Sequence, residues 1–298
     1  MSHLSVIIVS YNVREYLREC LQSVFGRTDG LTVEVWVVDN ASRDGSTAMV
    51  QTEFPQVRLI TNRANLGFAR AANQVLREAK GDYVLLLNPD ARLLDNSLAA
   101  LVNFLEQKSE VGVVGGAVFN PDCSLDPACH RGLPTPLAMA AKALGLDRLM
   151  PSNRTLAQCN MLWLPPDQEA EVISVSGGFL MTRRKVLESI GLLDERFFLY
   201  YEDSDFCDRA REAGWKVIFY PEAKVVHHKG ASSRNNPRLA RLVFCRSYLA
   251  YYDKHLARGR LKRWLVHFLV CLYSGFDPRL KATPGEITQL FQDSGGAA

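Results

Sequence analysis

The chain has 298 residues, of which 47% are hydrophobic and 22% charged, and its formal net charge is +3. These values are typical of a globular protein with either one large domain or a domain plus an appendage, and they exclude a disordered or fibrous chain. Seven scattered cysteines without a Cys-x-x-Cys pair argue against a disulfide framework and a zinc ribbon. Because an apolar strand begins at Leu4, we expect no secretory signal and a cytoplasmic protein.

Strands and helices are predicted to alternate through the first third of the chain. The predicted strands are apolar on both faces, which indicates a mostly parallel α/β sheet with helices on both faces. We place strands at Leu4–Val9, Val33–Val38, Val57–Ile60 and Asp82–Leu87. Helices are predicted at Val13–Phe25 and Phe68–Ala79, and a short one follows the turn-rich segment Asn40–Ser46 and ends at about Glu53.

The pattern loosens beyond a further strand at Val111–Val114. Residues 120–172 contain seven prolines, which predicts a long excursion that forms a wall or lid, or else a mobile surface loop. Regular elements then return. They are a strand at Val172–Val175, a helix from near Arg184, a helix from the Glu202 segment to about Ala213, and a strand from Lys216 to Tyr220.

The C-terminal part of the chain is strongly basic. Between His227 and Arg263 there are ten Lys or Arg and one acid, Asp253. Such a segment suits an anionic membrane surface or a phosphate-bearing substrate, with a solvated helical face as the plainer alternative. Nucleic acid is a rival partner, but no recognition motif accompanies the charge, and we expect no nucleic acid.

An apolar run, Trp264 to Tyr273, follows the basic residues and is interrupted by His267. It falls short of the ~20 residues of a membrane span, so it predicts peripheral membrane contact, or packing against the catalytic domain or a second subunit in a homodimer. We therefore divide the chain into a domain at residues 1–254 and a C-terminal helical extension at residues 255–298.

Acidic residues follow two apolar segments that lie far apart in the sequence. Asn88-Pro89-Asp90 closes the strand Asp82–Leu87, and Glu202-Asp203-Ser204-Asp205 follows Arg196–Tyr201. Open α/β sheets hold their ligands where the strands end, so one acid is placed to bind a metal and another to take a proton. Each motif taken alone is equally typical of a turn or a helix cap.

Asp90 is the candidate metal ligand, because a hard cation that bridges diphosphate oxygens requires a carboxylate at the sheet edge. Asn88 would support it through its amide oxygen or a water. His227 and His228 follow Ala223–Val226, and strand alternation sends their side chains to opposite faces, so only one of them can complete the coordination shell. A structural histidine is the alternative.

Asp203 is the candidate general base for an acceptor hydroxyl. Glu202 and Asp205 would tune or position it, since neighbouring carboxylates raise one another's pKa. The alternative is an acidic cluster that interacts with the dipole of a helix N-terminus.

Two segments are suited to a nucleotide. Asp39 follows a strand, where its carboxylate can accept hydrogen bonds from a pyrimidine N–H or a ribose, although Asp-Asn-x-Ser is also a common turn. Asn65-Leu66-Gly67 opens a helix whose backbone N–H groups can approach a diphosphate, with simple capping as the alternative. No G-x-G-x-x-G or G-x-x-x-x-G-K-[ST] motif supports a dehydrogenase or a P-loop enzyme.

Taken in their order along the chain, the motifs described above resemble those of family 2 glycosyltransferases of the GT-A fold. The resemblance covers residues 4 to about 233. Within that family the chain looks most like bacterial rhamnosyltransferases, which use dTDP-rhamnose in cell-surface polysaccharide synthesis. Many family members have Asp-x-Asp where this chain has Asn88-Pro89-Asp90. The remaining motifs that carry the resemblance are Ser10-Tyr11-Asn12, Val38-Asp39-Asn40-Ala41-Ser42, Asn65-Leu66-Gly67-Phe68-Ala69, Gly177-Gly178 and Glu202-Asp203-x-Asp205.

The resemblance implies an inverting, metal-dependent hexosyltransferase that moves a sugar from a nucleoside diphosphate to a glycan or lipid-linked acceptor, with Mg²⁺ or Mn²⁺ stabilising the leaving group. The family pattern favours His227 over His228 as the metal ligand. The implied site has Tyr11, Asn12, Asp39, Asn65, Gly67 and Asn88 at the donor, Asp90 and His227 at the metal, Gly177, Gly178 and Glu202 on the acceptor side, and Asp203 as the base.

Two other classes of function stay open. A sugar nucleotidyltransferase should carry a Gly-rich basic loop after its first strand, and Ser10–Glu15 is not such a loop. A catalytically silent sugar-nucleotide-binding or scaffold protein would share the fold, because folds do not dictate function. A processive synthase is not expected, since the chain lacks a Gln-x-x-Arg-Trp segment.

Overall fold

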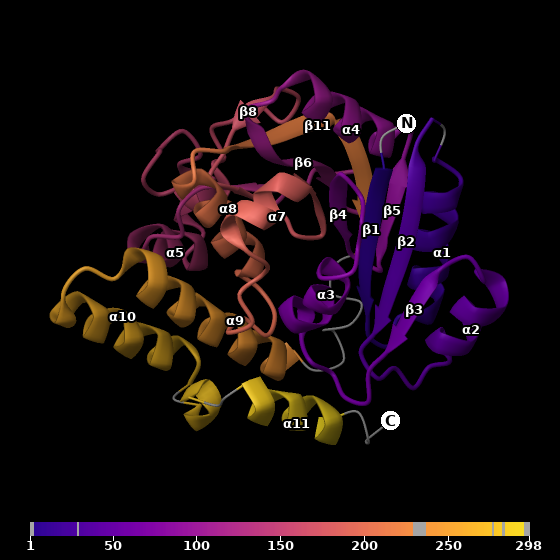
Figure 1. Cartoon of the computed structure of the whole chain (residues 1–298). Helices are drawn as coiled ribbons and strands as arrows, with labels where there is room; N and C mark the ends of the chain where they lie inside the picture. The colour runs from indigo at the N-terminus through magenta and orange to yellow at the C-terminus, as the bar shows by residue number, and fades with distance from the viewer. Residues whose placement is uncertain (1–2, 29, 229–236, 276, 282–283, 295–298) are drawn as a thin grey trace.

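The computed structural model describes residues 3–28, 30–228, 237–275, 277–281 and 284–294. A mixed sheet with the strand order β3-β2-β1-β4-β10-β6-β11-β5 forms its centre, and β8 pairs with β11. Figure 1 shows α1 and α2 on one side of strands β1 to β3 and α3 on the other, with α9 to α11 gathered below. A mostly parallel sheet covered by helices, as predicted, is confirmed.

The first part of the chain supplies most of the parallel strands. Its elements are β1 (His3–Ser10), α1 (Arg14–Phe25), β2 (Thr32–Asp39), α2 (Ser46–Glu53), β3 (Arg58–Thr61), α3 (Phe68–Leu76), β4 (Tyr83–Leu87), β5 (Ala91–Leu94), α4 (Ser97–Gln107) and β6 (Val111–Phe119).

The second part completes the sheet and adds the C-terminal helices. Its strands are β7 (His130–Arg131), β8 (Ala170–Glu171), β9 (Ser174–Val175), β10 (Phe179–Arg183) and β11 (Lys216–His227). Its helices are α5 (Pro136–Ala143), α6 (Leu146–Leu149), α7 (Arg184–Ile190), α8 (Glu202–Glu212), α9 (Pro237–Tyr251), α10 (Arg260–Tyr273) and α11 (Pro284–Ser294), with short turns η1 (Gln158–Asn160), η2 (Tyr252–Leu256) and η3 (Pro278–Lys281).

The main core forms because the strands carry apolar side chains on both faces. In β1 every residue after His3 is buried, and α1 adds Leu17, Leu21 and Val24 at helical spacing. Each such side chain contributes about 1.5–3 kcal/mol when it leaves water. This core fixes the strand ends, and therefore the edge at which the acidic residues lie.

Several strands differ from the sequence-based expectation, among them β5, β7 and β8, for which no strand was predicted. β10 pairs antiparallel with both β4 and β6, in a place where we predicted only a connection between Gly178 and the helix at Arg184. β11 does not end at Tyr220 but continues to His227, with a register shift between Tyr220 and Lys224 around Pro221. A bulge accommodates the proline, which cannot donate to the ladder, and this explains why the sequence looked like two separate segments.

The proline-rich excursion of residues 120–172 contains folded elements. It carries α5, α6 and β7, and β7 pairs antiparallel with β9. The pairing aligns His130 with Val175 and thereby brings Arg131 to the edge where α8 begins.

The C-terminal helices pack beneath the sheet through two smaller apolar clusters. Val266 of α10 is buried with Phe197, Tyr201 and Tyr248, so part of the predicted apolar run does contact the catalytic domain. Lys254 and His255, on the two sides of our proposed boundary, both contact Asp205, and the boundary stays a prediction. Among the described residues no helix combines the length and hydrophobicity needed to cross a bilayer.

Candidate active site

Asp90 and His227 meet because two antiparallel strands bring them together. Asp90 directly precedes β5, His227 ends β11, and the register pairs His227 with Ala91. His227 Nε2 lies 2.9 Å from Asp90 Oδ1, although the two residues are 137 positions apart. Both side chains are largely buried, with exposed fractions of 13% and 8%. The geometry therefore forms a nitrogen and oxygen pair at the sheet edge.

His228 takes the opposite direction, as strand alternation requires. Its ring packs on Tyr16 with the ring centroids 4.9 Å apart, while its backbone N–H donates to the Asp90 carbonyl at 3.0 Å. Of the two histidines, the structure places the imidazole of His227 against the Asp90 carboxylate.

The donor set at Asp90 fits a hard divalent cation. A 2.9 Å hydrogen bond joins His227 Nε2 to Asp90 Oδ1, and the carboxylate is the kind of oxygen ligand that such a cation prefers. Among the described residues no group of three or more His, Cys, Asp or Glu could hold a metal. A site of two protein ligands suits Mg²⁺ or Mn²⁺, since such ions take their other ligands from substrate phosphates and water.

Asn88 lies next to this pair. Its Nδ2 is 3.1 Å from His227 Nε2, and its backbone N–H donates to the Gly178 carbonyl at 3.0 Å. The amide therefore contacts the same imidazole nitrogen, Nε2, that bonds to Asp90.

Gly177 and Gly178 connect the two acidic clusters. A Cβ on Gly178 would lie 2.7 Å from Asn88 Nδ2, and a Cβ on Gly177 would lie 3.0 Å from Asp203 Cβ. Gly177 N–H also donates to Asp203 Oδ2 at 2.8 Å. A larger side chain at either position would make Asn88 or Asp203 shift, so the two glycines let the turn lie close to both.

Asp203 is buried and fully hydrogen-bonded. Oδ2 accepts from Gly177 and from the guanidinium of Arg131, while Oδ1 accepts from Ser204 N–H at 2.7 Å and Ser204 Oγ at 3.3 Å. A carboxylate has about four acceptor positions, so these bonds fill them. Ser204 Oγ is also 3.5 Å from Ser174 Oγ. If the hydroxyl turns to Ser174, Oδ1 gains the capacity to take a proton.

Arg131 is the site residue that the sequence analysis missed. It comes from β7, in the proline-rich excursion, and it also donates to the Val175 carbonyl at 2.9 Å. A lone arginine without a surrounding motif gives no sequence signal. Only the pairing of β7 with β9 identifies it as the cation beside Asp203.

Glu202 has an environment unlike that of Asp203. Its Oε2 is buried and has no hydrogen-bond partner among the described residues. Burial, followed by the nearby Asp203 charge, raises the pKa of Glu202 to about 8. The backbone of Tyr200 and Tyr201, just before it, is left-handed with φ of 69° and 68°, a conformation that is costly for aromatic residues. This left-handed turn directly precedes α8, whose first two residues are Glu202 and Asp203.

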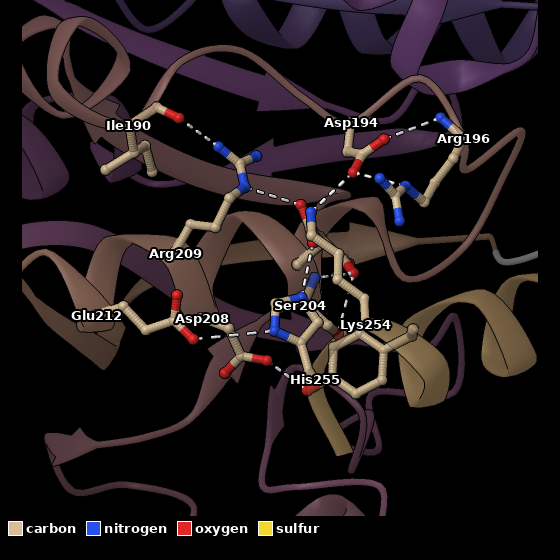
Figure 2. Close-up of polar contacts among 12 residues, drawn as sticks. Ile190, Asp194, Arg196, Ser204, Asp208, Arg209, Glu212, Lys254 and His255 are labelled. Carbon is tan, nitrogen blue, oxygen red and sulfur yellow. Dashed lines mark hydrogen bonds and ion pairs between the residues drawn. The ribbon is translucent and has the colours of Figure 1, made fainter. Parts of the chain in front are cut away.

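Asp205 bonds to basic residues rather than to Asp203, and its expected influence on Asp203 stays a prediction. It is fully buried and accepts from Arg209 at 2.9 Å and His255 at 2.7 Å, and its other ion-pair partner is Lys254 at 2.5 Å. Burial by itself raises the pKa of Asp205, but these hydrogen bonds and the Arg209 charge lower it to about 2. Figure 2 shows Lys254 also reaching Asp194, at 2.7 Å. Asp205 therefore fastens η2 to α8.

The donor side is built at the ends of β1 and β2, which pair Ser10 with Asp39. Asp39 Oδ2 accepts from Ser42 N–H at 2.9 Å. Asp39 Oδ1 and Ser10 Oγ are buried without a hydrogen-bond partner among the described residues. Because buried polar atoms normally have partners, these two atoms are candidates for hydrogen bonds from a ligand, and their contact with the donor stays a prediction.

Tyr11 and Asn12 lie beside this carboxylate. Asn12 has a left-handed backbone with φ of 54°, and its Oδ1 accepts from Arg43 N–H at 2.7 Å. Its own N–H donates to Ser42 Oγ at 2.9 Å. The two loops that follow β1 and β2 are thus joined, which places Tyr11 and Asn12 with Asp39.

Asn65 and Gly67 have internal partners. Asn65 Oδ1 accepts from Gly67 N–H at 3.0 Å and from Asn40 Nδ2 at 3.3 Å, and Phe68 N–H donates to the Phe198 carbonyl at 2.6 Å. A Cβ on Gly67 would lie 2.4 Å from that carbonyl oxygen. These contacts fix the loop before α3 against the segment before α8, and a direct contact with the donor stays a prediction.

Comparisons with known proteins agree with this geometry. Residues 5–162 match the model of glycosyl transferase family 2, and residues 167–292 match that of glycosyl transferase family group 2. The chain belongs to glycosyltransferase family 2.

Its relatives include an N-acetylglucosaminyl-diphospho-decaprenol L-rhamnosyltransferase of Mycobacterium tuberculosis, which is 31% identical over 91% of both chains. A low-salt glycan biosynthesis hexosyltransferase of Haloferax volcanii is 27% identical, over 77% of this chain and 68% of its own length. These relatives support the rhamnosyltransferase branch of family 2 and a role of the glycosyltransferase in cell-wall polysaccharide synthesis.

Solved structures share the fold. A mannosyltransferase from Pyrobaculum calidifontis, in complex with GDP-Man and Mn²⁺, superposes with a TM-score of 0.60 at 20% identity, over 99% of this chain and 75% of its own. GalNAc-T7 with UDP, GalNAc and Mn²⁺ gives a TM-score of 0.58 at 16% identity, over 85% of this chain and 48% of its own.

Proposed function

We propose that this glycosyltransferase transfers L-rhamnose from dTDP-rhamnose to a lipid-linked N-acetylglucosamine diphosphate, with inversion at the anomeric carbon. The Mycobacterium tuberculosis relative, whose name specifies a rhamnosyl transfer to such a lipid-linked acceptor, supports the sugar and the acceptor. The proposed setting is cell-surface polysaccharide synthesis at the cytoplasmic face of the membrane.

One observation carries the proposal. The Gly177-Gly178 turn bonds to Asn88 on one side and to Asp203 on the other, at 3.0 and 2.8 Å. The Asp90 and His227 pair, which Asn88 adjoins, therefore lies close to the buried Asp203 carboxylate. Direct displacement requires this arrangement, in which one group assists the departing diphosphate while another takes the acceptor proton.

The donor side holds the nucleotide. Asp39 Oδ1 and Ser10 Oγ are the buried atoms available to the base or the ribose, and Tyr11 and Asn12 form the adjacent wall. Asp90 and His227 would hold the divalent cation, which supplies positive charge to stabilise the diphosphate as it departs. Asn88 Nδ2 lies 3.1 Å from the same Nε2, so the amide must turn away before that nitrogen can bind the cation.

Asp203 is the proposed base. As Ser204 Oγ turns away, Oδ1 accepts the proton of the acceptor hydroxyl. The acceptor oxygen forms its bond to the anomeric carbon while the bond to the diphosphate oxygen breaks and the electron pair leaves with the diphosphate. Arg131 and Gly177 keep Oδ2 fixed meanwhile, so the carboxylate is pre-organised.

Glu202 would serve the acceptor differently. With its pKa raised to about 8 by burial and by Asp203, it is protonated at neutral pH and can donate a hydrogen bond to an acceptor oxygen. A second negative charge beside Asp203 is thereby avoided.

The test is a transfer assay with synthetic lipid-linked N-acetylglucosamine diphosphate and a panel of dTDP-, UDP- and GDP-sugars, with Mn²⁺, Mg²⁺ or a chelator. We expect transfer from dTDP-rhamnose that needs the cation, and an inverted anomeric configuration of the product by NMR. Transfer of a different sugar would overturn the donor assignment, and a retained configuration would overturn the mechanism. Nucleotide-sugar binding without any transfer would favour the scaffold alternative.

A further inference from the structure

The strongly exposed large hydrophobic side chains of the described chain fall in two segments, residues 137–150 and 261–273. Leu144 and Leu149 are 74% and 77% exposed in the first segment. Leu261 and Trp264 are 78% and 62% exposed in the second. Single exposed apolar residues are normal, but their concentration in two segments marks an interaction surface.

The outward face of α10 is apolar, whereas a surface helix of a globular protein normally turns its polar face outward. Exposed Leu265, Phe268, Leu269 and Leu272 recur at helical spacing, whereas Val266 points into the protein. Trp264 and Phe268 stack on that outward face, with ring planes 6° apart. Tryptophan is enriched at boundaries between an apolar phase and water, because its ring is apolar and its N–H is polar.

The two segments lie at the same end of the molecule. Met139 of α5 and Val266 of α10 pack on one apolar cluster that contains Tyr201 and Tyr248. Figure 1 shows α5 and α10 together at the left of the molecule, away from β1 to β3. We use the name apolar platform for the exposed side chains of residues 137–150 and 261–273.

The charges around the apolar platform are positive. Arg258, Arg260 and Lys262 are exposed, and none has a carboxylate partner among the described residues. The sequence contains no acid between Asp253 and Asp277, and the single acid among residues 127–166, Asp147, is buried. A surface that combines apolar and aromatic groups with unpaired cations is complementary to an anionic lipid bilayer.

The apolar platform also adjoins the acceptor side of the active site. Tyr201, which shares a cluster with Val266, directly precedes Glu202 and Asp203. Arg131, the partner of Asp203, lies shortly before α5 begins at Pro136. Contact of the platform with lipid would therefore bring Asp203 close to the surface of the bilayer.

From these observations we propose that the apolar platform docks on an anionic lipid bilayer and presents Asp203 to the acceptor. This inference rests on the proposed function for its biological purpose, since it explains how a lipid-linked acceptor reaches the site.

The test is flotation of the full chain with vesicles of phosphatidylcholine alone or mixed with phosphatidylglycerol. We expect binding to the anionic vesicles only, weakened by salt. Because each cation near an anionic surface contributes about 1 kcal/mol, Arg260→Glu with Lys262→Glu should weaken binding at least about 30-fold. Acids are favourable in the first turn of α10, so these changes do not threaten the helix.

Two apolar variants and one control complete the design. Trp264→Ser with Phe268→Ser, and separately Leu144→Ser with Leu149→Ser, should each reduce flotation, since both segments form the apolar platform. Lys80→Glu with Lys185→Glu removes the same charge next to the starts of β4 and α7, away from the platform, and should leave flotation unchanged.

Several results would overturn the proposal. They are equal flotation with neutral and anionic vesicles, no flotation at all, or an unchanged result for the Leu144 and Leu149 variant. A dimer in light scattering that Trp264→Ser with Phe268→Ser dissociates, together with no flotation, would assign the surface to a second copy. Transfer to an acceptor with a short, water-soluble lipid should persist in these variants, which separates failure of docking from failure of the proposed function.

Discussion

The donor side and the acceptor side of this site differ in how their carboxylates are satisfied. Asp39 keeps one buried oxygen without a partner among the described residues, next to the equally unpartnered Ser10 hydroxyl. Asp203 instead has its oxygens filled by Arg131, Gly177 and Ser204. We propose from this difference that ligand hydrogen bonds complete the donor side, whereas the acceptor side is already rigid and a single hydroxyl rotation frees the base.

The sharpest way to break this comparison is Asp203→Asn. The amide keeps the shape of the side chain but cannot take a proton, so we expect kcat to fall ~10²- to 10⁴-fold while donor binding persists. Asp208→Asn is the matched control, because Asp208 is buried on the same helix but contacts Tyr251. Lost donor affinity with unchanged turnover at saturation would exclude Asp203 as the base.

Arg131→Met tests the rigidity of the acceptor side. A carboxylate that moves by about 1 Å can cost ~10²-fold, and we expect that loss in kcat with the donor Kd unchanged. Arg131→Lys should restore part of the rate, since it returns a positive charge to Asp203 but lacks the planar guanidinium that also donates to the Val175 carbonyl. Steady-state kinetics with donor calorimetry separate the two constants. A purely structural arginine would instead lower the fraction of folded protein and leave kcat per active site intact.

Asp39→Asn tests the donor side. The substitution removes a charged acceptor at the unpartnered oxygen, and a hydrogen bond to a charged group is worth ~1.5–3 kcal/mol. We expect at least about tenfold weaker donor binding with nearly unchanged kcat. Asp44→Asn, in the same loop, should leave donor affinity alone because Asp44 bonds to Arg14 and Ser46. Equal donor affinity in the Asp39 variant would remove the nucleotide role of this carboxylate.

The last prediction concerns stability, through Glu202. Its pKa is raised from an ordinary 4.5 to about 8, so between these values the folded protein keeps a proton that the unfolded chain has lost. Stability attributable to this group therefore falls as pH rises through that window. Glu202→Gln should flatten the fall in Tm from pH 5 to pH 8, whereas the exposed Glu188→Gln should not. Parallel Tm curves for wild type and Glu202→Gln would contradict the raised pKa.

The parallel half of the sheet was predictable from the sequence because its strands are apolar on both faces and alternate with helices. β10 was not, since an antiparallel strand within such a sheet has the same composition as a parallel one. The closeness of Asp90 and His227 was predictable, because the order of the motifs along the chain resembles that of the family. The roles of Arg131 and Asp205 were not predictable, because each depends on a residue far away in the sequence. Arg131 contacts Asp203, and Asp205 contacts His255.

The most direct test of the account is calorimetric titration of dTDP in the presence and absence of Mn²⁺, with wild type, Asp90→Ala and Asp203→Asn. We predict that Mn²⁺ strengthens dTDP binding to wild type and to Asp203→Asn but not to Asp90→Ala. Such a result would place the cation on the donor side and the base on the acceptor side of the Gly177-Gly178 turn. Mn²⁺-dependent binding that survives in Asp90→Ala, or is lost in Asp203→Asn, would contradict this division of the site.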